Sequence, residues 1–233
     1  LDFKFHIISL SKWMNECIKK SSLFSNKETT YLPLHIDLSK WKKRDKKFSK
    51  DIFNLDQGKK ILLFGSATST NYRKGFDFLL NLFSQHKFED CKLIIFGERP
   101  KNLDELNIDY EYIGRINDSH SLSILYSAAD ILLMPSKIEV FGQVGLEANS
   151  CGTPCVIFEN TGATDYTKHK ENGYISKHLN ISDYANGIIW ILENTERYKK
   201  LSNNCIENIK NNYSDQLVGK KFIQTYQKLL EKY

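Results

Sequence analysis

Several features are scarce in this 233-residue sequence, and each absence excludes a class of protein. No apolar run approaches the ~20 residues that a helix needs to cross a bilayer, which excludes a transmembrane helix. The N-terminal stretch FKFHIISLS contains one lysine and a short mixed apolar run, which is too weak a pattern for a signal peptide. We therefore expect a cytoplasmic protein.

Cysteine is also scarce, with five residues in the whole chain. An odd number of cysteines in a chain of this size does not indicate a disulfide framework. Only Cys151 and Cys155, in the segment CGTPC, lie close together, and no histidine flanks them. A zinc site needs more ligands than this, so we expect no bound metal and interpret both cysteines as small packing residues beside a tight turn.

Charge of one sign is in modest excess, since 33 Lys and Arg against 28 Asp and Glu give a net charge of +5. A nucleic-acid-binding protein usually has a more concentrated excess, so we expect no nucleic-acid partner. The one dense cluster is KWKKRDKKFSK, from Lys40 to Lys50, with seven cations against Asp45. It is typical of a solvated linker. The alternative is a patch for an acidic acceptor or for anionic lipid headgroups, which would place the protein peripherally at the inner face of the cell membrane.

What is present is an ordinary globular composition, 41% hydrophobic and 26% charged, with a regular alternation of elements after residue 59. Apolar runs such as KKILLFG, CKLIIFG and YEYIG alternate with helical stripes and end at Gly65, Gly97 and Gly114. This pattern predicts an α/β fold, a Rossmann-like parallel sheet with helices on both faces. Ligands bind at the carboxyl ends of such strands, so the glycines are either simple turn residues or a backbone surface left open for a ligand.

We expect two boundaries along the chain. Residues 1–38 have the pattern strand, helix, strand, with Ser11 as the helix N-cap. Residues 39–58 interrupt the periodicity and are predicted to be a basic linker. Residues 59–233 are predicted to form the ligand-binding domain, ending in C-terminal helices.

The segment MPSKIEVFGQVGLEANSCGTPCV is the most informative one. Glu139 follows a predicted strand, and Glu147 comes eight residues later on a helix that we expect to begin near Gly142. The backbone N–H groups of Gly142, Gln143 and Val144 are unpaired at such a helix start and, with the helix dipole, form an anion site. A phosphate there, beside two carboxylates that accept hydrogen bonds from sugar hydroxyls, makes a coherent nucleotide-sugar site. The alternative is two surface glutamates on an ordinary helix.

The segment FGSATSTNYRKGFDFLL offers the opposite side of such a site. Arg73 and Lys74 directly precede a predicted helix and could reach a diphosphate, for which Gly65, Ser66 and Thr68 leave space. A pair of cations is what a metal-free transferase would use to stabilise a departing diphosphate. The alternative is two solvated cations, which the dipole at a helix N-terminus disfavours.

Together these segments resemble the C-terminal, donor-binding half of a family-4 glycosyltransferase of the GT-B fold. The matching pieces span about residues 8–175 and run in the family's order, from SKW and LPLHID through RKGFDFLL, LIIFG, YIG, LYSAADILLMPS, EVFGQVGLEA and CGTPCV to TGATD…NGY. The most specific piece is EVFGQVGLEA, because PS precedes it and CGTP follows it.

The resemblance implies a role for each matching residue. Glu139 would contact the transferred sugar or steady the diphosphate, and Lys74 would neutralise the donor phosphates; these two are the candidate catalytic residues. Glu147 would bind the ribose hydroxyls. The backbone from Gly142 to Val144 would also contact the donor.

The resemblance also suggests where the nucleobase would lie, and the chain differs from the family's pattern at two positions. The loop at Arg115 and Ile116 would lie against the base. Family members often have an arginine where this chain has Ser66, so Arg73 is our substitute for the second phosphate cation. Asp165, in TGATD, stands where the family has a glutamate.

The activity implied is that of a metal-independent, retaining enzyme of polysaccharide biosynthesis with no cofactor, using a UDP or GDP sugar as donor and a glycan or lipid-linked acceptor. Residues 1–38 would be the last part of an acceptor-binding N-terminal domain. Since the chain begins at Leu1 rather than Met, we expect a truncated protein that binds a donor but does not transfer it unaided. The alternatives are a GT-B epimerase or phosphorylase, and a non-catalytic nucleotide-sugar-binding module.

Overall fold

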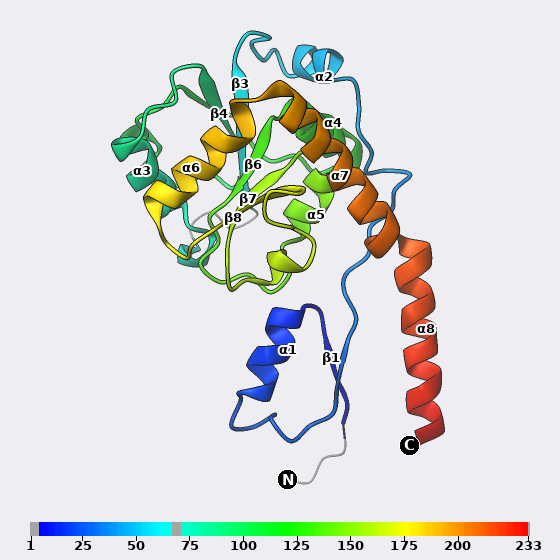
Figure 1. The fold of residues 1–233 in the computed structure, drawn as a ribbon. Coiled ribbons are helices and arrows are strands. Elements are labelled where there is room, and N and C mark those ends of the chain that lie inside the picture. Colours follow the sequence, from blue (N-terminus) through cyan, green and yellow to red (C-terminus); the bar gives the residue numbers. More distant parts are fainter. Residues whose placement is uncertain (1–4, 67–70, 233) are drawn as a thin grey trace.

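A six-stranded parallel sheet organises the computed structural model, which describes residues 5–66 and 71–232 (Figure 1). Its strands lie in the order β5-β4-β3-β6-β7-β8, and every neighbouring pair is parallel. The predicted α/β, Rossmann-like fold is confirmed. The strands are β3 (Lys60–Ser66), β4 (Cys91–Gly97), β5 (Tyr110–Tyr112), β6 (Ile131–Met134), β7 (Cys155–Phe158) and β8 (Gly173–Ser176).

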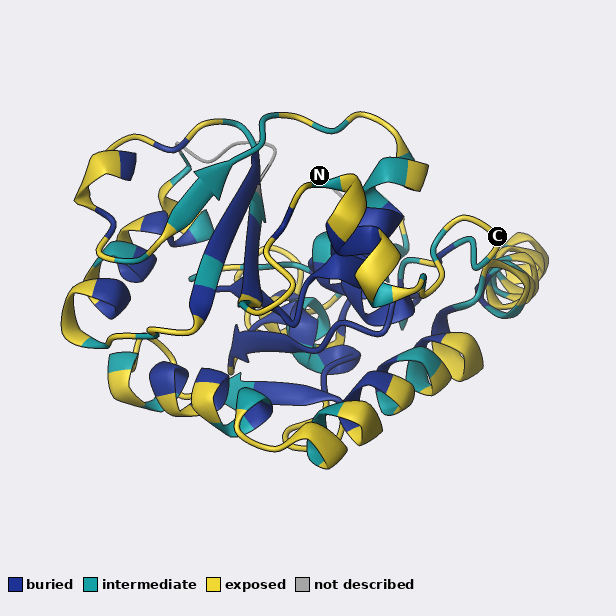
Figure 2. Cartoon of the chain, turned by 90° about the horizontal axis from the view of Figure 1, so that it is seen from above, coloured by how far each residue is buried: buried dark blue, intermediate teal, exposed yellow. Residues whose placement is uncertain are grey.

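Helices cover both faces of this sheet, and alternate residues of each strand point to opposite faces. On β3, Ile61 and Leu63 join one hydrophobic core while Leu62 and Phe64 join the other. In Figure 2 the central strands of the sheet are buried between the surrounding helices, while β5 at its edge is only partly buried. The first core contains residues of α4 (Ser119–Ala128), α5 (Gln143–Ser150) and α7 (Thr195–Tyr213), and the second those of α3 (Phe76–Gln85) and α6 (Ile181–Leu192).

The strand order reverses between β3 and β6. From β3 the chain moves outward through β4 to β5, and then returns to the other side of β3 to form β6, β7 and β8. In open α/β sheets the crevice outside the carboxyl ends of the strands at such a reversal is the usual ligand site. The topology therefore points to the loop after β3 and the loop after β6.

A small N-terminal lobe packs beyond the carboxyl ends of the main sheet. It consists of a parallel pair, β1 (Ile7–Ser9) and β2 (Thr29–Tyr31), with α1 (Lys12–Lys19) between them. The expected N-cap is confirmed, since the Ser11 hydroxyl accepts a hydrogen bond from the backbone N–H of Met14.

Side chains from the main body hold this lobe. The Asp165 carboxylate, in the short 3-10 helix η3 (Gly162–Asp165) after β7, accepts a hydrogen bond from the Lys12 backbone N–H at 2.9 Å. The last helix, α8 (Asp215–Lys232), extends away from the body beside the lobe (Figure 1), and its Lys232 forms an ion pair with Glu28.

The basic linker is not a solvated chain, because part of it folds into α2 (Lys46–Ile52). The Lys46 ammonium lies 2.7 Å from the Asp130 carboxylate. Lys50 is 5% exposed, and its ammonium donates hydrogen bonds to three backbone carbonyls between residues 56 and 59. The Lys43 ammonium reaches the hydroxyl of Ser202. These cations anchor the segment to the fold, and a lipid contact through the remaining ones stays a prediction.

Two short 3-10 helices complete the described chain: η1 (Tyr72–Lys74) and η2 (Leu103–Glu105). No helix within residues 5–66 and 71–232 combines the length and the apolar character required to cross a bilayer.

Candidate functional site

An ion pair joins the loops that follow β3 and β6. The Lys74 ammonium lies 2.7 Å from the Glu139 carboxylate, although 65 residues separate the two in sequence. The Ser136 hydroxyl donates a second, longer hydrogen bond to the same carboxylate oxygen, at 3.3 Å. The structure thus brings the two candidate catalytic residues together at the point where the strand order reverses.

The backbone around Lys74 is fixed by close approach to the second loop. Lys74 ends η1, and Gly75 follows with a φ of 73°, in the left-handed region that favours glycine. A Cβ atom at Gly75 would overlap the carbonyl oxygen of Pro135. Only a glycine allows the two loops to come this close.

Lys137 clamps the same two loops together. Its backbone N–H donates to the Arg73 carbonyl at 2.8 Å, and its ammonium forms an ion pair with Asp77 at 2.5 Å. The ammonium also lies 3.2 Å from the centre of the Tyr72 ring. Because Tyr72 and Arg73 belong to η1, this clamp limits the positions available to Lys74.

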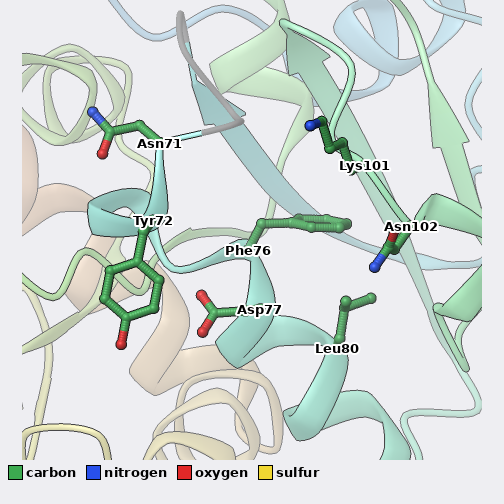
Figure 3. A pocket seen from close by; sticks show the side chains of 7 residues that line it. All are labelled: Asn71, Tyr72, Phe76, Asp77, Leu80, Lys101 and Asn102. Atoms are coloured by element: carbon green, nitrogen blue, oxygen red, sulfur yellow. The ribbon is translucent and has the colours of Figure 1, made fainter.

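A separate pocket of about 220 Å³ lies beside η1, against α3 and the loop after β4 (Figure 3). Its lining contains Phe76 and Leu80 of α3, with Lys101 and Asn102 opposite them. It does not include Lys74, Glu139 or Glu147, so this pocket is distinct from the site at the reversal of strand order.

Helix α5 begins where the sequence predicts, with Gly142 as its N-cap at a φ of 82°. Since Gly142 has no side chain and no other described residue caps this helix, the N–H groups of its first turn, including those of Gln143 and Val144, are available to an anion. The Gly142 carbonyl accepts a hydrogen bond from the Tyr166 hydroxyl at 2.7 Å, which fixes the entry to the helix.

Glu147 is almost buried on α5, with 8% of its surface exposed. Its carboxylate accepts a hydrogen bond from the Tyr126 hydroxyl at 2.9 Å. Burial raises the pKa of Glu147 to about 7, while hydrogen bonds from Tyr126 and Gln143 act in the opposite direction. A carboxyl with this pKa is partly ionised at neutral pH and can accept hydrogen bonds from hydroxyl groups. Its contact with a ribose stays a prediction.

Two of the glycines at the strand ends, Gly65 and Gly114, differ in how much space surrounds them. A Cβ atom at Gly65 would overlap the ring of Phe96, so internal packing requires that glycine. Gly114 has a φ of 79° and open space where a Cβ would point. Of these two glycines, Gly114 alone fits the interpretation of a backbone surface left open for a ligand. Ser66 ends β3, but its side chain lies outside the described part of the structure, as does Thr68.

Arg73 and the loop after β5 also lie at this end of the sheet. Arg73 is exposed, and its side chain donates to the Asn71 amide oxygen at 3.3 Å. Arg115 is exposed, whereas Ile116 packs against the first core. Their contacts with a phosphate or a nucleobase stay predictions. Within residues 5–66 and 71–232, no group of three or more His, Cys, Asp or Glu side chains is arranged to hold a metal ion.

Two tyrosines that contact α5 were not predicted from the sequence. Tyr126 and Tyr166 each place a buried hydroxyl against α5, one on Glu147 and one on Gly142. The one feature that could have pointed to them is that a buried tyrosine needs a hydrogen-bond partner. The sequence does not reveal which partner each tyrosine selects, because that depends on tertiary packing.

Comparison with known proteins gives one family match and many relatives. The sequence profile of the family described as "Glycosyl transferases group 1" matches residues 45–211. A glycosyltransferase of Methanocaldococcus jannaschii, described as uncharacterized, is 25% identical over 244 residues, which cover 97% of this chain and 60% of that relative. The chain spans between 43% and 60% of the length of the first three curated relatives that it matches.

Two solved structures show the same fold. Sucrose-phosphate synthase from Thermosynechococcus elongatus superposes with a TM-score of 0.85 at 21% identity, covering 98% of this chain and 59% of that one. HepE of Anabaena, in complex with UDP-glucose, superposes with a TM-score of 0.79 at 16% identity, covering 97% of this chain and 65% of that one.

Proposed function

The chain belongs to the group 1 family of glycosyl transferases, and from this premise we propose that it is the donor-binding part of a retaining glycosyltransferase. The donor is a UDP or GDP sugar, and the acceptor is a glycan or a lipid-linked glycan bound by an N-terminal domain. That HepE was solved with UDP-glucose supports a nucleotide-sugar donor.

The observation that carries the proposal is the Lys74–Glu139 ion pair beside the uncapped start of α5. An ammonium and a helix N-terminus that converge on one crevice suit a diphosphate. Glu147, on the same helix, adds a carboxylate that can accept hydrogen bonds from the ribose hydroxyls.

The same groups suggest how transfer proceeds. Without donor, Glu139 neutralises Lys74. A bound diphosphate supplies its own negative charge to Lys74, which frees the Glu139 carboxylate to accept hydrogen bonds from the sugar. As the bond from the anomeric carbon to the diphosphate breaks, the acceptor hydroxyl bonds to that carbon from the same face and gives its proton to the leaving phosphate oxygen. Lys74 and the N–H groups of α5 stabilise the charge that develops on the leaving oxygen. Removing one such donor costs about 2.7–4 kcal/mol in a typical enzyme.

Nucleotide binding tests the donor site directly in this chain. Calorimetry with UDP and with GDP should show binding of at least one of them, weakened by about tenfold or more in Lys74→Ala and in Glu147→Ala, since each loses a charged hydrogen bond to the ligand. Lys47→Ala, an exposed residue of α2, is the matched control and should bind as wild type does. Unchanged binding in both site variants would show that the site assignment is wrong.

Transfer itself is tested with the full-length protein. Incubation with a nucleotide sugar and an acceptor panel should yield a product whose anomeric configuration, read by NMR, is that of the donor. A donor that changes without any acceptor would indicate an epimerase. Binding without transfer over the whole panel would indicate a non-catalytic module.

A further inference from the structure

The buried hydroxyl of Tyr126 holds Glu147 by one carboxylate oxygen. The bond joins α4 to α5, and the Tyr126 side chain is fully buried. We propose that Tyr126 is a positioning residue, whose hydroxyl holds the Glu147 carboxyl in the orientation that accepts a hydrogen bond from a sugar hydroxyl of the bound nucleotide. This inference rests on the proposed function, because it assigns the partner of Glu147 to the nucleotide's ribose.

The ring of Tyr126 is held from several sides, so its hydroxyl has one position. Trp41, from the linker, and Phe96, from β4, each lie with ring centres 5.9 Å from that of Tyr126. The Tyr126 carbonyl accepts a hydrogen bond from the Thr153 hydroxyl at 2.5 Å. A hydroxyl fixed in this way orients its partner without further loss of conformational freedom on binding.

A buried tyrosine hydroxyl needs a hydrogen-bond acceptor, but that need alone does not explain why Tyr126 pairs with a carboxylate. Tyr184 and Tyr166 are equally buried, and their hydroxyls donate to the backbone carbonyls of Val156 and Gly142. Tyr126 instead donates to an ionisable group that burial destabilises. A glutamine at position 147 would accept the same hydrogen bond without a charge. Retaining a carboxyl there costs stability, which is typical of a functional residue.

The hydrogen bond also favours the ionised form of Glu147. Burial raises the pKa of Glu147 to about 7, and the Tyr126 hydroxyl opposes that rise. Without this hydroxyl the pKa rises further, and less of the carboxyl is ionised at neutral pH.

Three titratable groups interact electrostatically with Glu147: Tyr126 of α4, Cys151 directly after α5, and Tyr166 after η3. They do not themselves titrate near neutral pH, because burial raises the pKa of each of them.

The experiment compares Tyr126→Phe with Tyr184→Phe. Both variants lose one buried hydroxyl, but Tyr184 lies on α6, in the core on the opposite face of the sheet. Calorimetry with UDP and GDP between pH 6 and pH 9 should show affinity reduced about 10- to 150-fold at pH 7 in Tyr126→Phe, the expected loss for a hydrogen bond to a charged group. The pH at which binding falls to half should rise in that variant. Tyr184→Phe should match wild type in both measurements.

A double-mutant cycle separates positioning from general damage to the fold. If Tyr126 acts through Glu147, Tyr126→Phe should have no further effect on nucleotide binding in a Glu147→Ala background, which has no acceptor for the Tyr126 hydroxyl to orient. Additive losses, or unchanged affinity and pH midpoint in Tyr126→Phe while wild type binds, would overturn the role of Tyr126 and leave the proposed function intact. A wild-type chain that binds neither UDP nor GDP would overturn both.

Discussion

The ionised carboxylate of Glu147 destabilises the folded protein, because it is buried. Its pKa rises from 4.5 to about 7 on folding, so the folded state binds the proton more tightly than the unfolded state. The contribution of Glu147 to stability is therefore lost as pH rises from 4.5 through 7. At about 1.4 kcal/mol for each pKa unit, the ionised carboxylate costs roughly 3 kcal/mol above pH 7.

We predict that Glu147→Gln is more stable than wild type at pH 8, by up to about 3 kcal/mol, and differs by less than about 1 kcal/mol at pH 5. Glutamine accepts the Tyr126 hydrogen bond but cannot ionise. Urea unfolding at the two pH values measures the difference. A variant less stable than wild type at pH 8 would contradict the buried-carboxyl account.

At the residue scale, the sequence predicted the charged members of the site and missed the residues that orient them. Lys74 and Glu139 stand in recognisable segments, and the structure places them in contact. Tyr126, Lys137 and Ser136 carry no comparable local signal. Their importance comes from partners that lie on other elements or in a folded loop, and spacing along the chain does not predict such pairings.

At the scale of the element, Gly75 is the position where two loops meet. Gly75→Ala would combine a left-handed φ, which costs about 1–2 kcal/mol, with overlap on Pro135, which adds about 1–3 kcal/mol. Gly114→Ala is the matched control, because its φ is similar but the space around it is open. Urea unfolding should therefore show a clearly larger loss of stability in Gly75→Ala. Equal losses of stability in the two variants would mean that the overlap with Pro135 does not destabilise the protein.

Helix α2 depends on one buried carboxylate. Asp130 is 4% exposed and accepts hydrogen bonds from the Lys46 ammonium and the Ile61 backbone N–H, both at 2.7 Å. Asp130→Ala would leave the buried Ile61 N–H without this acceptor, while the Lys46 ammonium keeps the Ala129 carbonyl and the Tyr198 hydroxyl, so we expect a loss of about 1–3 kcal/mol in the free energy of unfolding. The control Lys47→Ala, an exposed α2 lysine, should change stability by less than about 0.5 kcal/mol.

Elements buried on both faces were predictable from the sequence, and α2 was not. The strands KKILLFG and CKLIIFG appear as continuous apolar runs because both of their faces are covered. In α2 the buried residues are Ser49 and Lys50 while Phe48 and Ile52 are exposed, so the apolar residues of its sequence do not mark its buried face. A lysine whose ammonium is satisfied by carbonyls cannot be distinguished from a solvated lysine by composition alone.

At the scale of the whole molecule, the N-terminal lobe and the main body should differ in local stability. A two-stranded sheet is marginal by itself, and this one shares no strand pairing with the six-stranded sheet. We predict that amides of β1 and β2 exchange hydrogen faster than those of β3 and β4. In Asp165→Ala, which lacks the acceptor for Lys12, the lobe should exchange faster still while β3 and β4 keep their rates. Uniform acceleration of both parts would contradict this division.

The strand order is the part of the fold that periodicity could not predict. Apolar patterns identify strands and helices one at a time, but they do not reveal which strands become neighbours. The pairing of Leu62 and Leu63 with Ile131 and Leu132 places β6 beside β3, and that pairing brings together the loops that carry Lys74 and Glu139.

The distance in sequence between the two halves of the site has a consequence for synthesis of the chain. A nascent chain that has reached α3 already contains Lys74, but Glu139 leaves the ribosome 65 residues later. Domains fold as units during synthesis, so the crevice does not exist until β6 has paired with β3 and α5 has followed it. If the proposed function holds, a nucleotide-sugar donor therefore cannot assist the early steps of folding, and it would stabilise the domain only after the β3–β6 pair has formed.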